Sequence, residues 1–412
     1  MIPASSRPTT GWLILLVMSV SAINLRSGLV GFSPLLPIVK DQMDLSYTVS
    51  GFIMAVPAIF MALSGAVGGY LLMKIGSKQM VGWGVFLTAL GNLARGVSVD
   101  AVTLLLSSML FGVGLGLAQA AMPLIVKQSF PNTAGTATGA YTGGMLVGAA
   151  MGAALTLPVL LPLSGTLSWR GPMFFWAALA FVALVAWHCA IPAGKSLFQQ
   201  PDWRSWANVL RKPKAWLVAV LFAAQCSVFY AYISWIPTFY EEAGINSTPI
   251  FTVYHLLSIP AAFLIPILSD RLGSRRGLLI ATSFMTLAGV LCQTFFYDTI
   301  PFVWAGLVGF GITSIFVLCM VLTVDVSEPE EVPGVTALVL FLGYIFSPIA
   351  PTFVGWIRDL TGSFTWGLLV PWVLASVLLI VLSWFVPRRV GLSSVPGSSP
   401  SGLGGAVSGH HK

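Results

Sequence analysis

The chain has 412 residues, of which 57% are hydrophobic and only 8% are charged. Soluble domains carry roughly 25% charged residues because their surfaces face water, so this composition excludes an ordinary soluble protein and indicates a lipid-facing surface. The formal net charge of +7 does not indicate nucleic-acid binding, because the basic residues fall in short loops between apolar runs.

Twelve apolar runs follow one another along the chain, each close to the length of a bilayer-spanning helix. Strands of a membrane barrel would alternate apolar and polar residues over shorter segments, so the pattern predicts helices. The first run is too long for a secretory signal and lacks a small-residue cleavage site. The expected spans are residues 12–38, 47–72, 79–96, 103–126, 137–163, 172–191, 214–240, 248–268, 278–296, 301–324, 335–357 and 365–386.

The distribution of Lys and Arg between the loops predicts the orientation. Both termini and one set of loops carry most of the basic residues, for example Lys74, Lys78, Arg275 and Arg276. The opposite loops are expected to carry only four basic residues: Lys40, Arg95, Arg170 and Arg358. We therefore predict a multi-pass protein of a bacterial inner membrane with both termini in the cytoplasm.

Two sequence features recur at nearly the same distance. Residues 73–78 (Met-Lys-Ile-Gly-Ser-Lys) follow the second span and residues 270–275 (Asp-Arg-Leu-Gly-Ser-Arg) follow the eighth, 197 positions later. Gly135 precedes the fifth span and Gly334 the eleventh, 199 positions later. The recurrence predicts an all-α membrane protein whose twelve transmembrane helices form two pseudo-symmetric six-helix bundles. Parallel halves of this kind are typical of secondary transporters.

Four segments follow from this organisation. We expect an N-terminal six-helix bundle over residues 1–191 and a polar cytoplasmic linker over 192–213. A C-terminal six-helix bundle should cover 214–390. Residues 391–412, rich in Gly, Ser and Pro, are expected to be a disordered tail or the remnant of an expression vector.

The loop after the eighth span resembles the signature of the major facilitator superfamily, in residues 269–276 (Ser-Asp-Arg-Leu-Gly-Ser-Arg-Arg). The copy at residues 69–76 is degenerate, because Met73 stands where the superfamily usually has an acid. The resemblance implies a conformational latch in the C-terminal half, made by Asp270, Arg271, Gly273 and Arg275.

Within the superfamily, residues 12–386 resemble the branch that contains the cyanate and 2-nitroimidazole transporters. The resemblance rests on Asn24-Leu25-Arg26 with residues 33–37, on residues 225–237, on 168–171 and on 355–363. It implies alternating-access transport of a small solute that is often anionic or nitrogenous.

Arg26 is the sharpest candidate for binding, because it lies near the middle of the first span, where a charge is costly and usually functional. We expect all thirteen acids in loops or at helix ends, so Arg26 would lack a carboxylate at its own depth. An anionic substrate could supply that partner, since the guanidinium fork suits oxyanions. Alternatively, Arg26 is a structural strut held by neutral oxygens. Ser19 and Ser33 share its helical face, as a cavity lining or as a packing seam.

The repeat places Gln225 at the position equivalent to Arg26. Gln225 could bind substrate, orient Arg26 or join two helices. Mid-membrane polar and aromatic residues could also line a site or simply pack within the bundle. The candidate substrate-binding residues are Arg26, Gln225, Tyr230, Asn24, Gln119, Tyr344 and His255.

His255 could carry a proton if transport is proton-coupled, because its side chain titrates near neutral pH. A hydrogen-bonded core histidine is the other interpretation. The four cysteines fall in apolar runs and are read as packing residues. No phosphate loop, metal-ligand cluster or nucleophile triad is visible, so we expect no cofactor, no metal and no enzyme activity.

Three functions remain open. The first is a secondary transporter of a small anionic or nitrogenous solute anchored at Arg26. The second is an exporter of flat, drug-like heterocycles with an aromatic pocket. The third is a receptor on a transport fold without flux. The expected partners are a small molecule, the lipid bilayer and possible protons, with no nucleic acid, and we expect a monomer.

Overall fold

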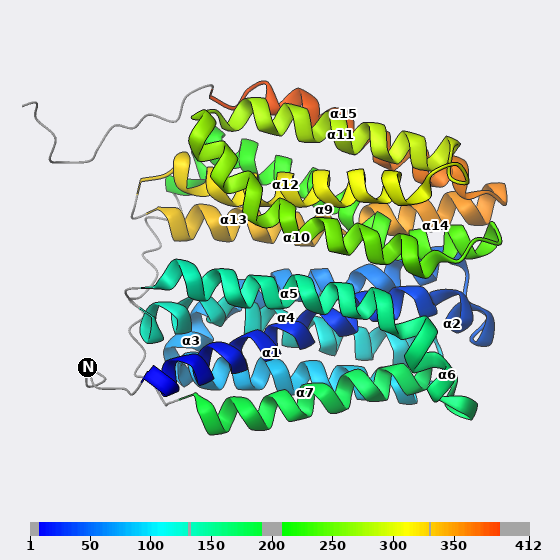
Figure 1. Cartoon of the computed structure of the whole chain (residues 1–412), viewed down its shortest axis with the longest axis horizontal. Coiled ribbons are helices and arrows are strands. Elements are labelled where there is room, and N and C mark those ends of the chain that lie inside the picture. The colour runs from blue at the N-terminus through cyan, green and yellow to red at the C-terminus, as the bar shows by residue number, and fades with distance from the viewer. Residues whose placement is uncertain (1–7, 131–132, 192–207, 329–330, 388–412) are drawn as a thin grey trace, which may run out of the picture.

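The computed structural model describes residues 8–130, 133–191, 208–328 and 331–387, and these residues form helices and connecting turns without a strand. The helices run side by side along the long axis of the molecule (Figure 1). The N-terminal half forms one layer and the C-terminal half the other, with the N-terminus at one end of both layers. The predicted all-α fold is therefore confirmed.

The N-terminal half contains a long helix that turns back at a glycine. α3 covers 51 residues, yet Gly76 inside it has φ 78° and ψ 163°, so two predicted spans join there. A positive φ is accessible to glycine without a steric cost. The elements are α1 (Pro8–Phe32), η1 (Ser33–Leu35), α2 (Leu36–Gln42), α3 (Tyr47–Val97), α4 (Ala101–Ser129), α5 (Ala134–Leu155), a π-helical turn η2 (Thr156–Leu160), α6 (Leu161–Leu163), η3 (Gly165–Leu167) and α7 (Arg170–Ala190).

The C-terminal half repeats this order with one visible break. The predicted eleventh span is divided into α13 and α14, since Pro348 follows the end of α13 and cannot donate a backbone hydrogen bond. The elements are α9 (Pro213–Glu242), α10 (Ser247–Leu272), α11 (Arg275–Phe295), α12 (Pro301–Asp325), α13 (Val332–Phe346), α14 (Ile349–Thr361) and α15 (Phe364–Ser383).

Eleven segments of the described chain are long and apolar enough to cross a membrane. The remaining predicted span is the second part of α3, residues 77–97, which carries the buried polar residues Asn92 and Arg95. The prediction that Arg95 lies in a loop is therefore wrong. Its side chain lies in the last turn of the helix and is only 1% exposed. The prediction failed because it placed the loop boundary from the charge alone and did not allow for burial of that charge.

The internal repeat is confirmed by equivalent backbone contacts in the two halves. A Cβ on Gly112 would lie 2.4 Å from the carbonyl oxygen of Pro57, and one on Gly309 would lie 2.2 Å from that of Tyr254. Each N-terminal residue precedes its counterpart by 197 positions. Small residues let membrane helices approach this closely, so both halves use one packing scheme.

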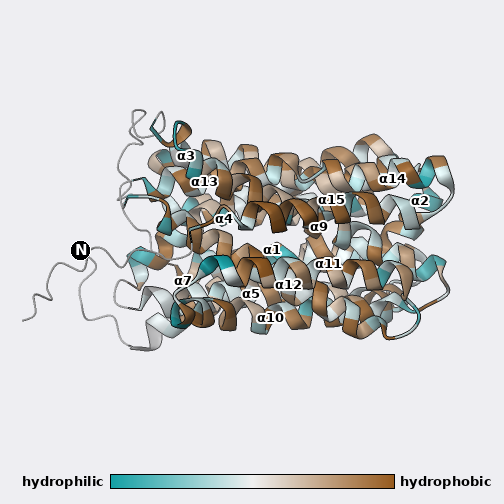
Figure 2. Ribbon diagram, turned by 90° about the horizontal axis from the view of Figure 1, so that it is seen from above, coloured by the Kyte–Doolittle hydropathy of each residue, from teal (hydrophilic) through white to brown (hydrophobic). Residues whose placement is uncertain are grey.

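Hydrophobic residues cover the length of the helices, and hydrophilic residues gather at their ends (Figure 2). Exposed apolar side chains such as Leu63, Val182 and Leu374 suit a lipid-facing surface. Most of the expected linker (192–213) and the whole of the expected tail (391–412) lie outside the described residues. Their boundaries therefore stay predictions.

Candidate functional site

Arg26 lies on α1 at the junction of the two halves. Its half-buried guanidinium is within side-chain hydrogen-bonding reach of Tyr230 on α9 and Tyr344 on α13. Its charge also acts on three further side chains of the C-terminal half: Cys226, Tyr254 and His255. The N-terminal half thus supplies a cation, and the C-terminal half supplies hydroxyl groups around it.

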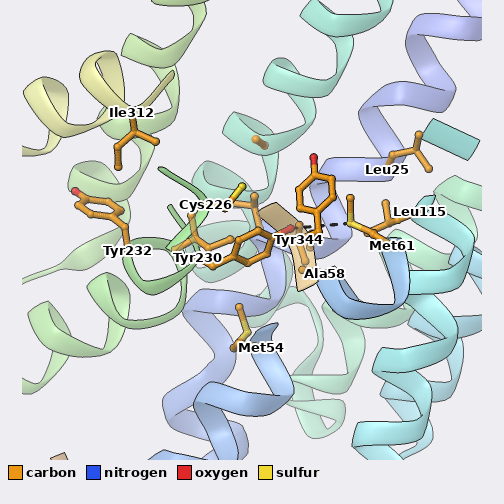
Figure 3. Packing of buried hydrophobic residues seen from close by; sticks show 14 of the residues in the cluster. Leu25, Met54, Ala58, Met61, Leu115, Cys226, Tyr230, Tyr232, Ile312 and Tyr344 are labelled. Atoms are coloured by element: carbon orange, nitrogen blue, oxygen red, sulfur yellow. Dashed lines mark hydrogen bonds between the residues drawn. The ribbon is translucent and has the colours of Figure 1, made fainter. Parts of the chain in front are cut away.

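The two tyrosines beside Arg26 contact each other and also form hydrogen bonds with residues of the N-terminal half. Their rings meet edge to face, with centroids 6.5 Å apart. The Tyr230 hydroxyl donates to the sulfur of Met61 at 4.0 Å (Figure 3), and the Gln119 amide donates to the Tyr344 hydroxyl at 3.5 Å. Met61 and Gln119 belong to α3 and α4, so each tyrosine contacts both halves.

Arg26 is not paired with a carboxylate in the described part of the chain. The ion pairs found there involve Lys40, Lys212, Arg275 and Arg358. A guanidinium does not lose its proton in proteins, so a partly buried one requires acceptors or an anion. The site therefore has a positive charge that its own residues do not neutralise.

Gln225 and Asn24 use their amides within their own halves. Gln225 is buried, donates to the carbonyl of Ile312 at 3.4 Å and accepts from Cys226 at 3.5 Å. Asn24 donates to the carbonyl of Val20 one turn earlier, while its own oxygen lacks a partner. Both side chains stay candidates, but the hydrogen bonds of Gln225 turn it towards α12.

The other candidates on α1 and α10 have packing contacts of their own. Ser19 donates to the carbonyl of Ala140, and Ser33 donates to that of Ile233. These bonds support the packing-seam interpretation of that helical face. His255 is buried against the edges of Phe251 and Tyr254, at ring distances of 4.8 Å, and its Nε2 has no partner.

Two of the four predicted latch residues, Asp270 and Arg275, form an ion pair at the end of the molecule that holds the termini, whereas no such contact is seen for Arg271 in the described structure. Arg275 binds Asp270 at 2.7 Å and Asp325, the last residue of α12, at 3.0 Å. Gly273 ends α10 with a φ of 60°. The partners of Arg275 all belong to the C-terminal half, so in this conformation the ion pairs brace that half internally.

The opposite end carries a polar cluster that joins the two halves. The hydroxyl of Tyr47, at the start of α3, donates to Glu242 at 2.7 Å. Arg358 binds the same carboxylate at 2.9 Å and lies over the ring of Tyr47 at 4.8 Å. The ammonium of Lys40, on α2 of the N-terminal half, lies 4.5 Å from the centroid of that ring. We call Lys40, Tyr47, Glu242, Arg358 and Asp359 the far-end cluster.

Asp359 makes the most directional contact of the far-end cluster. Its carboxylate accepts from the backbone N–H of Tyr47 at 2.9 Å and from that of Thr48 at 2.8 Å. It also accepts from the Thr48 hydroxyl at 2.6 Å. The first N–H groups of a helix have no partner within the helix and attract negative charge. A residue of the C-terminal half thus caps a helix of the N-terminal half.

Backbone packing closes this end further. A Cβ on Gly51 would lie 2.4 Å from the carbonyl oxygen of Pro351, and one on Gly355 would lie 2.2 Å from that of Tyr47. Trp235 donates to the same Pro351 carbonyl at 2.8 Å. Sequence reasoning did not identify the far-end cluster. The available signal was the charged segment 355–363 in a chain with so few charges.

The described residues contain no group of three or more His, Cys, Asp or Glu side chains able to hold a metal ion. The groups around Arg26 are one fixed positive charge, two phenol hydroxyls and one amide. These groups can recognise a small polar solute from both halves at once.

Comparison with known proteins gives consistent results. The family model of the Major Facilitator Superfamily matches residues 14–250 and 242–408. The cyanate transport protein CynX of Escherichia coli (strain K12) is 28% identical over 384 residues, 91% of this chain and 98% of that protein. The 2-nitroimidazole transporter of the same strain is 23% identical over 379 residues, 88% of this chain and 92% of that protein.

The fold has counterparts among solved structures. The xylose transporter XylE from E. coli, in its inward open conformation, matches with a TM-score of 0.76 at 14% identity. The match covers 93% of this chain and 98% of that one. The resemblance to the branch with the cyanate and 2-nitroimidazole transporters is confirmed. The chain therefore belongs to the Major Facilitator Superfamily, as a multi-pass membrane protein that serves secondary transport of a small molecule and is not an enzyme.

Proposed function

We propose that this protein moves a small anionic solute across a bacterial inner membrane by alternating access, with Arg26 as the anchor of the substrate. The observation that carries the proposal is the position of Arg26 between the halves, beside Tyr230 and Tyr344 and without a carboxylate partner among the described residues. A planar or compact anion could accept from the guanidinium and from both hydroxyls at once.

The choice of an anion rests on electrostatics. A charge at mid-membrane depth is costly, and the cost falls when a counter-charge arrives. A hydrogen bond to a charged group contributes about 1.5–3 kcal/mol, so loss of the Arg26 contact should weaken binding about tenfold to hundredfold. The cyanate transport protein among the relatives is named for a small anion.

Alternating access is supported by the unequal ends of the molecule. The far-end cluster and the contacts of Gly51 and Gly355 join the halves at one end. At the other end, the ion pairs of Arg275 stay within the C-terminal half. Because Lys and Arg dominate the loops on the side of the termini, we assign that side to the cytoplasm, and we infer that the end joined by the far-end cluster lies on the opposite side of the membrane.

The decisive experiment is uptake of labelled anions into proteoliposomes. Arg26→Gln keeps polarity without charge, and Arg26→Lys keeps charge without the fork. We expect no measurable uptake by the first variant and reduced uptake by the second. Arg276→Gln is the matched control, since Arg276 lies over the ring of Trp384 on the outside of the bundle. Undiminished uptake by Arg26→Gln would contradict the proposal.

A second candidate is transport of a flat neutral heterocycle. Aromatic rings around the site favour it: Phe222 lies 5.9 Å from Tyr344, and Phe229 lies 5.2 Å from Tyr230. One relative is named as a 2-nitroimidazole transporter. Under this proposal, Tyr230→Leu abolishes uptake of an azole and Arg26→Gln does not, which is the reverse of the ranking expected for an anion.

The coupling and assembly state belong to the same proposal. His255 is the candidate proton carrier, since its buried Nε2 has no hydrogen-bond partner among the described residues. Uptake driven by an imposed pH gradient, measured for wild type and His255→Gln, tests this role.

We propose a monomer as the working unit. A ligand that binds without any flux in proteoliposomes would favour a receptor.

A further inference from the structure

A second arginine lies inside the N-terminal bundle, away from the junction of the halves. Arg95 is 1% exposed, and its guanidinium lies over the rings of Phe111 at 4.2 Å and Phe32 at 5.0 Å. Its Nε donates to the hydroxyl of Ser108 at 3.1 Å. These contacts bind α3 to α1 and α4.

The charge of Arg95 has no counter-charge in the described structure. None of the ion pairs among the described residues involves this guanidinium. Its Nη1 atom is buried without a hydrogen-bond partner. Two ring faces and one hydroxyl offset only part of the cost of removing a cation from water.

Other unpartnered polar groups contact the same part of α1 as Arg95 does. Asn92 is one turn earlier on α3, packs against Gly28 of α1, and leaves both amide atoms without a partner. The indole nitrogen of Trp176 on α7 also lacks a partner and packs against Gly31. Gly31 precedes Phe32, the residue that contacts the Arg95 guanidinium. The contacts of the three side chains with α1 therefore all fall within residues 28–32.

We propose that this cluster of Arg95, Asn92 and Trp176 binds a small inorganic anion of the size of chloride, separately from the Arg26 site. Water could satisfy the donors, but it could not neutralise the charge. Arg26 interacts with residues of the C-terminal half, whereas the contacts of Arg95 are confined to the N-terminal half. The anion would therefore stabilise one bundle and is not the cargo.

The C-terminal half provides an internal comparison. Gln293 stands 198 positions after Arg95 and donates to the hydroxyl of Tyr240 at 3.3 Å. The same structural position thus functions in a six-helix half without a charge. Arg95→Gln should therefore fold, because it gives the N-terminal half the side chain that the C-terminal half uses.

The test compares thermal unfolding in sodium chloride and in sodium gluconate at equal ionic strength. Wild type should unfold about 2 °C or more higher in chloride, as expected when a ligand binds only the folded state. Arg26→Gln should keep this difference, and Arg95→Gln should lose it. Equal midpoints for wild type in the two salts would overturn the proposal.

A direct measurement does not depend on the stability of a variant. Crystals of the wild-type protein grown in sodium bromide should give an anomalous peak within contact distance of the Arg95 guanidinium and the Trp176 indole nitrogen. Crystals that show bromide elsewhere, or no peak at this cluster, would exclude the anion. Neither measurement involves transport, so failure here would leave the role of Arg26 to its own experiment.

Discussion

The two halves of the chain share their backbone packing and differ in the charges they place on it. Inside the bundles, the N-terminal half has Arg26 and Arg95, whereas the C-terminal half has Gln225 and Gln293 at the corresponding places. Both glutamines donate to neutral oxygens of their own half. The comparison indicates that the scaffold needs a polar group at these positions but not a charge.

At the end that holds the termini, the difference is reversed. Arg275 and Asp325 form an ion pair in the C-terminal half. Ser77 and Gln128, which precede them by 198 and 197 positions, form a neutral hydrogen bond of 2.8 Å. The two halves therefore carry their charged residues at different depths: inside the bundle in the N-terminal half, and at the end that holds the termini in the C-terminal half.

Exchanging Arg26 and Gln225 gives the largest expected effect. The double variant Arg26→Gln/Gln225→Arg moves the charge to the equivalent position of the other half. Gln225 is 3% exposed and faces the Ile312 carbonyl, so the new charge would be buried at a cost of several kcal/mol. We expect no recovery of uptake in proteoliposomes and a lower unfolding midpoint than for Arg26→Gln. Recovered uptake would show that the site is symmetric.

The shared packing can be tested at its equivalent glycines. Gly112→Ala and Gly309→Ala each force a Cβ against a carbonyl oxygen, at 2.4 and 2.2 Å. Overpacking of this kind costs about 1–3 kcal/mol, and both variants should lower the unfolding midpoint alike. Gly65→Ala, where nothing lies within 4 Å, should raise it slightly, because alanine favours a helix over glycine by about 1 kcal/mol. A large effect in one half alone would break the equivalence.

The bracing pair can be converted into its neutral counterpart. Asp325→Gln leaves Arg275 with Asp270, whose side chain is largely exposed, so we expect a loss of about 1 kcal/mol. Adding Arg275→Ser reproduces the Ser77–Gln128 pair of the N-terminal half. The double variant should lose less stability than the sum of its single changes, as measured in a double-mutant cycle. Strict additivity would mean that the pair contributes nothing.

The smallest expected effect concerns the N-terminal cap of α4, compared with that of α12, its counterpart in the C-terminal half. Asp100 caps α4, and hydrogen bonds from the Thr103 backbone and hydroxyl hold the pKa of its carboxyl below the usual value. The cap is complete above about pH 4 and is lost as pH falls through the lowered pKa. Below that pH, the wild-type unfolding midpoint should fall further than that of Asp100→Asn.

The counterpart Asp298 supplies the control for this pH effect. It stands 198 positions later and accepts a long bond of 3.5 Å from Thr299, while α12 begins without a side-chain cap. Asp298→Asn should follow wild type at every pH. A divergence like that of Asp100→Asn would show that the acidic loops act in another way.

The sequence was sufficient to predict the helices and the repeat. The length of a span reflects the thickness of the bilayer, and the offset of 197 reflects a duplicated scaffold. Both features can be read along the chain without knowing which distant segments contact each other. The repeated loop also places Gly76 and Gly273 at equivalent positions, and both glycines have a positive φ in the structure. These features depend on residue type and position alone.

Contacts between segments far apart in the chain were not predictable. Arg95 was assigned to a loop, because a rule that counts charges at span ends cannot detect the rings of Phe32 and Phe111. Asp359 was visible as a charged residue, but its partner is a backbone N–H group some 300 positions earlier, a group that every helix start possesses. Such pairings depend on how two bundles dock, which no single segment specifies.

The cap that Asp359 provides for α3 has a kinetic consequence. Moving the halves apart at that end exposes the N–H groups of Tyr47 and Thr48 and breaks three hydrogen bonds together. Under the proposed alternating-access mechanism, the empty carrier would cross this barrier without help from bound solute. We therefore expect exchange of one substrate molecule for another to outpace net flux, and substrate on the opposite side of the membrane to accelerate uptake.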